Sequence, residues 1–167
     1  DVSGPPAHEG LMALPRAAIQ VHGCRMEVDR NGLEVLDRDE CLLLLRHATL
    51  GRIGLLVGVL PMVVPVNFTL VDERIVILSA AGAKLDAAIE HRLVAFEADA
   101  FDSLYHSGWS VMVTGAAREV TDPDELAELL RAPLVRWAPL GQERVIAIST
   151  DMVSGRRIVA GRPRREV

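Results

Sequence analysis

The chain has 167 residues, half of them apolar, and this length suits one ordinary domain with a buried core. Its formal net charge of −5 argues against a nucleic-acid partner, and no segment approaches the roughly 20 consecutive apolar residues of a membrane span. Cys24 and Cys41 form no CxxC or Cys/His ligand pattern, and the histidines lack partners at metal-ligand spacing. We therefore expect buried thiols, a cytoplasmic location, and neither a metal site nor a membrane partner.

Residues 1–32 are predicted to form an N-terminal extension, because Pro15 interrupts their weak periodicity. The body begins with a helix signal. Asp37 precedes an apolar run and Glu40 follows three residues later, which is the spacing of a capping box. Gly51 is expected to end this helix as a C-terminal glycine.

From Arg52 the pattern changes to that of strands, with a turn around Gly58. The next segment, PMVVPVNFTLV, is followed by a turn at residues 71–74 and by IVILS, which predicts a hairpin buried on at least one face. Pro61 and Pro65 cannot donate to a strand ladder, so we expect them at an edge or a bulge.

The loop from Ser79 to Lys84, SAAGAK, combines small residues with one hydroxyl and one cation. Small side chains let backbone N–H groups approach a ligand, and the N-terminus of a helix predicted to follow would point its positive end the same way. The loop is a candidate phosphate site. The alternative is an ordinary loop that ends in a solvated lysine.

The rest of the chain adds strands at residues 93–99, 109–120, 144–149 and 152–160. A polar loop is expected at residues 100–108, and Asp122 with Pro123 and Glu125 marks another helix start. Strands that follow one another, with three or four short helices, favour an antiparallel barrel or sandwich over a doubly wound sheet. The usual nucleotide-binding glycine fingerprints are absent from the sequence.

The succession GRIG, PMVVPVNF, ILSAAGAKLDAA, LVAFEAD, SGWSVMVTGAAREV and VIAISTDMVSGRRI resembles the pyridoxamine 5′-phosphate oxidase-like flavoproteins. It is similar, more narrowly, to the branch with nitroimidazole-resistance proteins and many actinobacterial members. This resemblance implies a mainly β fold, a six-stranded antiparallel split β-barrel with short flanking α-helices, over residues 33–162, with 163–167 as a basic tail. It also implies a homodimer that binds FMN in a groove between protomers.

The resemblance implies a cofactor site, residue by residue. One strand would offer backbone groups to the flavin ring, the small-residue loop would hold the phosphate, and groups near the dimer interface would complete the site. The residues that match these positions are Pro65, Val66 and Asn67 for the ring, Ser79 and Lys84 for the phosphate, Trp109 and Ser110 near the interface, and Arg157, beside Arg156, for a further anionic contact.

Two differences from the oxidase narrow the range of functions. Met62 stands where the oxidase has an arginine, and the paired Arg-Lys of its phosphate loop is reduced to Lys84. Oxidation of pyridoxamine phosphate is therefore not expected. Three hypotheses remain: an FMN-dependent oxidoreductase that reduces a small nitro- or quinone-type acceptor, a split barrel that uses the deazaflavin F420, and a cofactor-free dimeric binding or regulatory protein. The sequence assigns no catalytic residue.

Overall fold

The computed structural model describes residues 27–80, 92–132 and 143–158. Along these ranges it forms strands and helices in the order β1 (Glu34–Leu36), α1 (Arg38–His47), β2 (Leu50–Val57), β3 (Leu60–Val71), β4 (Arg74–Ala80), β5 (Arg92–Asp102), β6 (Ser107–Glu119), α3 (Pro123–Leu129), β7 (Glu143–Ile148) and β8 (Met152–Ile158). Neither of these helices is long and apolar enough to cross a membrane.

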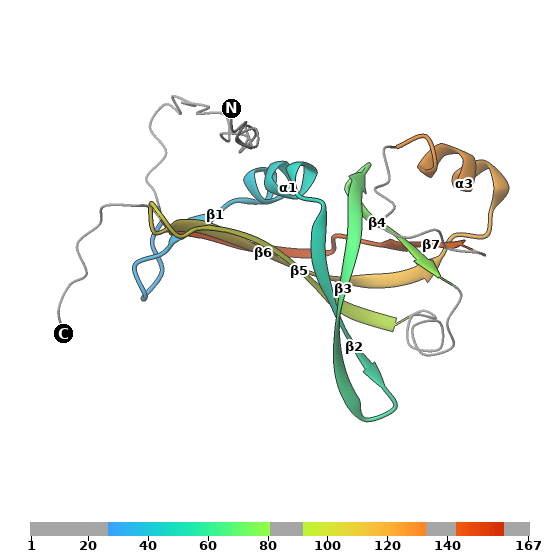
Figure 1. Ribbon diagram of the computed structural model, residues 1–167, viewed down its shortest axis with the longest axis horizontal. Coiled ribbons are helices and arrows are strands. Elements are labelled where there is room, and N and C mark those ends of the chain that lie inside the picture. The colour runs from blue at the N-terminus through green and yellow to red at the C-terminus, as the bar shows by residue number, and fades with distance from the viewer. Residues whose placement is uncertain (1–26, 81–91, 133–142, 159–167) are drawn as a thin grey trace, which may run out of the picture.

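Six of the strands close into an antiparallel barrel (Figure 1). The hydrogen-bonded order is β1-β8-β6-β5-β2-β3-β4-β7, and a further pairing of β6 with β7 joins the barrel's ends. Strands β1 and β8 extend the sheet beyond β6, while α1 and α3 flank it. The predicted mainly β, six-stranded barrel with short flanking helices is confirmed.

Alternate residues of the barrel strands fill its interior, as the two-residue period of a strand requires. Phe96 of β5 is fully buried and meets Phe68 of β3 edge to face, with ring centroids 4.8 Å apart. From α1, Leu45 and Cys41 pack against the same core. Cys41 is thus the buried thiol that the sequence predicted, whereas Cys24 lies outside the described residues.

The capping box at the start of α1 is confirmed. The Asp37 side chain accepts a hydrogen bond from the Glu40 backbone N–H at 2.8 Å, and the Glu40 carboxylate accepts one from the Asp37 N–H at 3.4 Å. The predicted helix end at Gly51 is wrong, because the helix is capped by Ala48 in extended conformation. Gly51 lies within β2, where an added Cβ would stand 2.3 Å from the Phe96 ring. This close approach, and not a helix cap, requires glycine there.

The hairpins of the barrel follow the predicted turns. The β2–β3 turn uses Gly58 at φ +63°, and the β3–β4 turn places Asp72 and Glu73 at φ 45° and 58°, the left-handed region typical of tight hairpins. Strand β3 pairs with β2 over Leu60–Asn67 and with β4 over Phe68–Val71. Pro61 and Pro65 therefore lie on a stretch paired on one side only, which confirms their predicted edge position.

Two boundaries differ from prediction. The expected polar loop at residues 100–108 is too long, since β5 continues to Asp102 and β6 begins at Ser107. The Asp102 carboxylate accepts hydrogen bonds from the Leu104 and Tyr105 N–H groups and tightens the turn to four residues. Strand β1 was not predicted, because three residues carry too little pattern to register.

The second predicted helix start is confirmed as α3, with Asp122 as its N-cap and Pro123 in its first turn. Several other predictions concern residues outside the described ranges: the helix after Lys84, most of the N-terminal extension, and the C-terminal tail. The domain boundaries at residues 32 and 162 stay predictions.

Candidate functional site

The candidate ring-binding residues lie on the part of β3 that has an open edge. Pro65, Val66 and Asn67 pair with β2, opposite Arg52, Gly51 and Leu50. On the other side, pairing with β4 begins only at Phe68, so in the described part of the chain no strand covers this edge. Backbone groups along the open edge can bond a ligand, as a further strand would.

Asn67 carries a second signal at this edge. Its side-chain oxygen Oδ1 is buried and, among the described residues, has no hydrogen-bond partner. A buried polar atom without a partner costs about 1–3 kcal/mol, so native proteins usually satisfy it with a ligand or water. The sequence singled out Asn67 for its backbone alone; no sequence pattern reveals the buried side-chain oxygen.

Ser79 lies close to the point where β3 and β4 stop pairing, which is called the split below. The last register pair of these strands is Phe68 with Ile77, so continued pairing would have set Val66 opposite Ser79. Ser79 is instead 8% exposed and pairs in register with Arg144 of β7. Three of the predicted residues, Val66, Asn67 and Ser79, thus lie just beyond the last register pair of β3 and β4, while Lys84 lies outside the described residues.

The remaining predicted residues form a separate group on β6 and β8. Trp109 is the register partner of Arg157, and Ser110 that of Arg156. Trp109 is partly buried and packs against the core. In either direction round the barrel, two strands lie between β6 and β3, so these strands form opposite walls of the barrel. One protomer therefore does not bring both groups of residues together.

The two arginines of β8 are paired with acidic side chains. Arg157 lies 3.3 Å from Glu34 and 3.4 Å from Glu40, and the Arg156 Nε lies 3.1 Å from Asp29. Bonds from backbone N–H groups and from Arg156 hold the pKa of Asp29 below its ordinary value. Both arginines lie on β8, within the strand predicted at residues 152–160. The proposed anionic contact at Arg157 stays a prediction.

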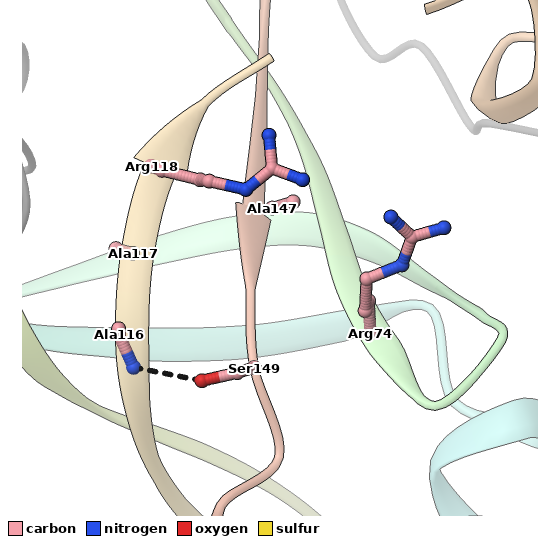
Figure 2. A pocket seen from close by; sticks show the side chains of 6 residues that line it. All are labelled: Arg74, Ala116, Ala117, Arg118, Ala147 and Ser149. Atoms are coloured by element: carbon pink, nitrogen blue, oxygen red, sulfur yellow. Dashed lines mark hydrogen bonds between the residues drawn. The ribbon is translucent and has the colours of Figure 1, made fainter. Parts of the chain in front are cut away.

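A cluster of charged side chains that the sequence did not predict lies at the start of α3. Glu125 accepts bonds from Arg74 of β4, at 2.6 Å, and from Arg118 of β6, at 3.1 Å for the longer of two contacts. Beside the arginines lies a depression of about 300 Å³ (Figure 2), lined by Arg74, Ala116, Ala117, Arg118, Ala147 and Ser149. Only the fold joins these residues, which come from β4, from β6, and from β7 with the residue that follows it.

The outer face of the sheet carries an exposed apolar band. Val63, Gly54, Ala95, Thr114 and Met152 are successive register partners across β3, β2, β5, β6 and β8. Val63 and Met152 are 71% and 63% exposed. Further exposed apolar side chains on these strands are Leu56, Leu93 and Met112. Such a contiguous apolar face is typical of a protein–protein interface.

An ion-paired group borders this apolar band. Arg52 of β2 lies 2.6 Å from Asp99 and 3.0 Å from Glu97, both on β5. The bond to Asp99 is the largest of the effects that raise the pKa of Arg52. The outer face therefore combines an apolar centre with a charged margin, the usual anatomy of an interface.

The family follows from comparison with known proteins. The sequence model of the pyridoxamine 5′-phosphate oxidase family matches residues 37–157. The uncharacterised protein Rv0080 of Mycobacterium tuberculosis is 38% identical over 145 residues, covering 83% of this chain and 95% of that protein. The chain belongs to the pyridoxamine 5′-phosphate oxidase family.

Solved structures share the fold. A FAD-binding protein from Mycobacterium smegmatis has 35% sequence identity and a TM-score of 0.69, over 76% of this chain and 99% of that one. A protein from Corynebacterium glutamicum, provisionally assigned as a pyridoxamine 5′-phosphate oxidase, has 28% identity and a TM-score of 0.70, over 82% of this chain and 100% of that one. The predicted family resemblance is thus confirmed.

Proposed function

We propose that this protein is a homodimeric, flavin-binding oxidoreductase that transfers electrons to a small organic acceptor of the nitro or quinone type. The observation that carries the proposal is the open edge of β3, where the buried Asn67 oxygen has no partner among the described residues. In a family with a FAD-binding member 35% identical to this chain, a flavin is the ligand that suits such an edge.

The residues at the split fit the polar half of a flavin ring. That half of the ring carries an N–H donor between two carbonyl acceptors, and Asn67 Oδ1 requires a donor. Backbone N–H groups along the open edge of β3 would donate hydrogen bonds to the two ring carbonyls. Pro65 cannot contribute, because proline has no backbone N–H. A bound flavin supplies the electron chemistry, while the chain binds and orients it and limits access to the ring.

The phosphate of the cofactor is assigned to Ser79 and Lys84. A hydroxyl and an ammonium suit a phosphate, and each charge-assisted bond is roughly twice as strong as a neutral one. FMN, which the sequence analysis predicts, and FAD, which the Mycobacterium smegmatis protein binds, share the ring and the ribityl phosphate. Both cofactors therefore make the same demand on this part of the site.

The F420 alternative receives less support. A groove for F420 is expected to carry more basic residues than one for FMN, and Arg156 and Arg157 are the described arginines near the end of the chain. Their charges are matched by Asp29, Glu34 and Glu40. Little uncompensated charge is left on β8 for an additional anionic tail.

The homodimer is proposed to form through the apolar band on the outer face of the sheet. Exposed Val63 and Met152 lie at opposite ends of the band, and Gly54 and Ala95 between them leave room for a partner's side chains. Within one protomer two strands lie between β3 and β6, which carries Trp109, and three lie between β3 and β8, which carries Arg157. A second protomer is the source from which such groups can reach the ring.

Purified full-length protein tests the proposal directly. We expect flavin absorbance as isolated or after incubation with FMN or FAD, and chromatography of the released cofactor identifies which one is bound. A colourless protein that binds neither would contradict the proposal. Quenching of F420 fluorescence alone would instead establish the deazaflavin alternative.

Variants locate the cofactor within the protein. Asn67→Leu removes the buried oxygen and with it one neutral hydrogen bond, so we expect flavin affinity to fall by about two- to ten-fold, from roughly 0.5–1.5 kcal/mol. Lys84→Ala removes the ammonium, and we expect a fall of about ten- to a hundred-fold, from roughly 1.5–3 kcal/mol for a charged hydrogen bond. Asn31→Leu, at an exposed turn, is the matched control and should bind as the unmodified protein does. Unchanged flavin affinity in both site variants would show that the cofactor does not bind at the split.

A further inference from the structure

Two arginines converge on one carboxylate at the start of α3, beside the depression of Figure 2. We propose that Arg74 and Arg118 form a binding site for a small aliphatic carboxylate, and that Glu125 occupies this site as an internal ligand in the free protein. The site is distinct from the proposed flavin site. Arg74 and Ser79 lie at opposite ends of β4, five residues or about 17 Å apart.

The arginines have hydrogen-bonding capacity to spare. A guanidinium offers five N–H donors in a planar fork that matches a carboxylate. Arg118 gives Glu125 two bonds and Arg74 gives it one, and within the described ranges no other side chain accepts a hydrogen bond from either arginine. A second carboxylate, or one that replaces Glu125, therefore finds donors already in position.

The centre of the site holds two cations and one largely buried anion. Two guanidinium groups face the single carboxylate of Glu125, whose side chain is largely buried. Two other acids lie nearby. Asp72 is 3.9 Å from Arg74 but mostly exposed to solvent, and Asp151 accepts a hydrogen bond from Ser149 at 2.7 Å. Glu125 is therefore the main competitor for an incoming anion.

The floor of the depression selects the class of ligand. Three alanines, Ala116, Ala117 and Ala147, line it. The Ser149 hydroxyl is engaged by Asp151 and by the Ala116 N–H, so it offers the ligand no further donor. A volume of about 300 Å³ is at the small end for ligand pockets. A short acid with an aliphatic stem, like the Glu125 side chain itself, suits an apolar floor below two guanidinium groups.

Succinate is the probe for this site. Full-length protein with nitrogen-15 in its arginine side chains is titrated with sodium succinate, against sodium chloride at matched ionic strength, and the Nε–H signals of Arg74 and Arg118 are followed. We expect weak saturable shifts in the unmodified protein and at least ten-fold tighter binding in Glu125→Gln. Arg118→Gln should abolish the shifts at Arg74.

Control variants separate the site from general effects. Arg144→Gln removes an arginine from neighbouring β7 outside the depression, and should leave succinate binding unchanged. If Arg118→Gln does not fold, Arg118→Lys replaces it, because lysine keeps the charge but lacks the planar guanidinium. This variant should bind succinate at least three-fold more weakly than the unmodified protein. The proposal is overturned if Glu125→Gln binds no tighter than the unmodified protein, if an Arg118 variant binds equally well, or if inorganic phosphate binds and succinate does not.

Discussion

Gly115 of β6 lies directly against the backbone of Ser149. A Cβ built at Gly115 would stand 1.8 Å from the Ser149 carbonyl oxygen, a rigid backbone atom. We expect Gly115→Ala to lower the free energy of unfolding by about 1–3 kcal/mol or more, as overpacking does. Gly54→Ala is the control, because its Cβ would meet Ala95 at 3.6 Å, an ordinary contact. Urea denaturation measures both, and equal midpoints would contradict the expectation.

Glu125 links stability to pH at the scale of one residue. The bond from Arg118 and the nearby Arg74 lower the pKa of Glu125 from its ordinary value of 4.5. A lowered pKa in the folded state means that stabilisation is complete above the unfolded value and is lost as pH falls through the folded one. The difference in unfolding free energy between the unmodified protein and Glu125→Gln should therefore be constant near neutrality and shrink below about pH 4.5. A difference that persists in acid would show that packing, not charge, is what the variant loses.

Helix α1 depends on its first turn. The Asp37–Glu40 capping box satisfies two backbone N–H groups, and the helix then holds Cys41 and Leu45 against the barrel core. Asp37→Ala should lower the free energy of unfolding by about 1 kcal/mol. Asp39→Ala, in the same turn but outside the capping box, should lower the free energy of unfolding by clearly less. Thermal unfolding followed by circular dichroism compares them, and equal losses would mean that the cap adds nothing beyond helix-end charge.

The whole molecule is expected to be a dimer. If the apolar band is the interface, Val63→Glu or Met112→Glu buries a charge there and should raise the dimer dissociation constant at least about a hundred-fold, or roughly 3 kcal/mol. Leu43→Glu is the control, since Leu43 is an exposed apolar residue on α1, away from the band. Light scattering after size exclusion reports the mass of each. A monomeric unmodified protein, or equal dissociation in all three variants, would exclude this interface.

Much of the fold follows from short-range patterns. The capping residues Asp37 and Asp122 marked both described helices, and Gly58 and the acidic turn at residue 72 marked two hairpins. Gly51 was misassigned because glycine serves both helix ends and close packing, and only the position of Phe96 distinguishes the two. Of the candidate site, Val66, Asn67 and Ser79 were named from the sequence and meet at one split, whereas the Arg74–Arg118–Glu125 group was not foreseen.

By itself the sequence determined the succession of strands from β2 to β8, the turns of two hairpins, and the family, because these depend on neighbouring residues and on the order of short motifs. Tertiary structure decided where β3 leaves β4, how the Asn67 oxygen is buried, and which acids neutralise the arginines of β8. Such features depend on contacts between residues distant in the chain. No local pattern encodes them, because each partner's position is fixed only when the barrel closes.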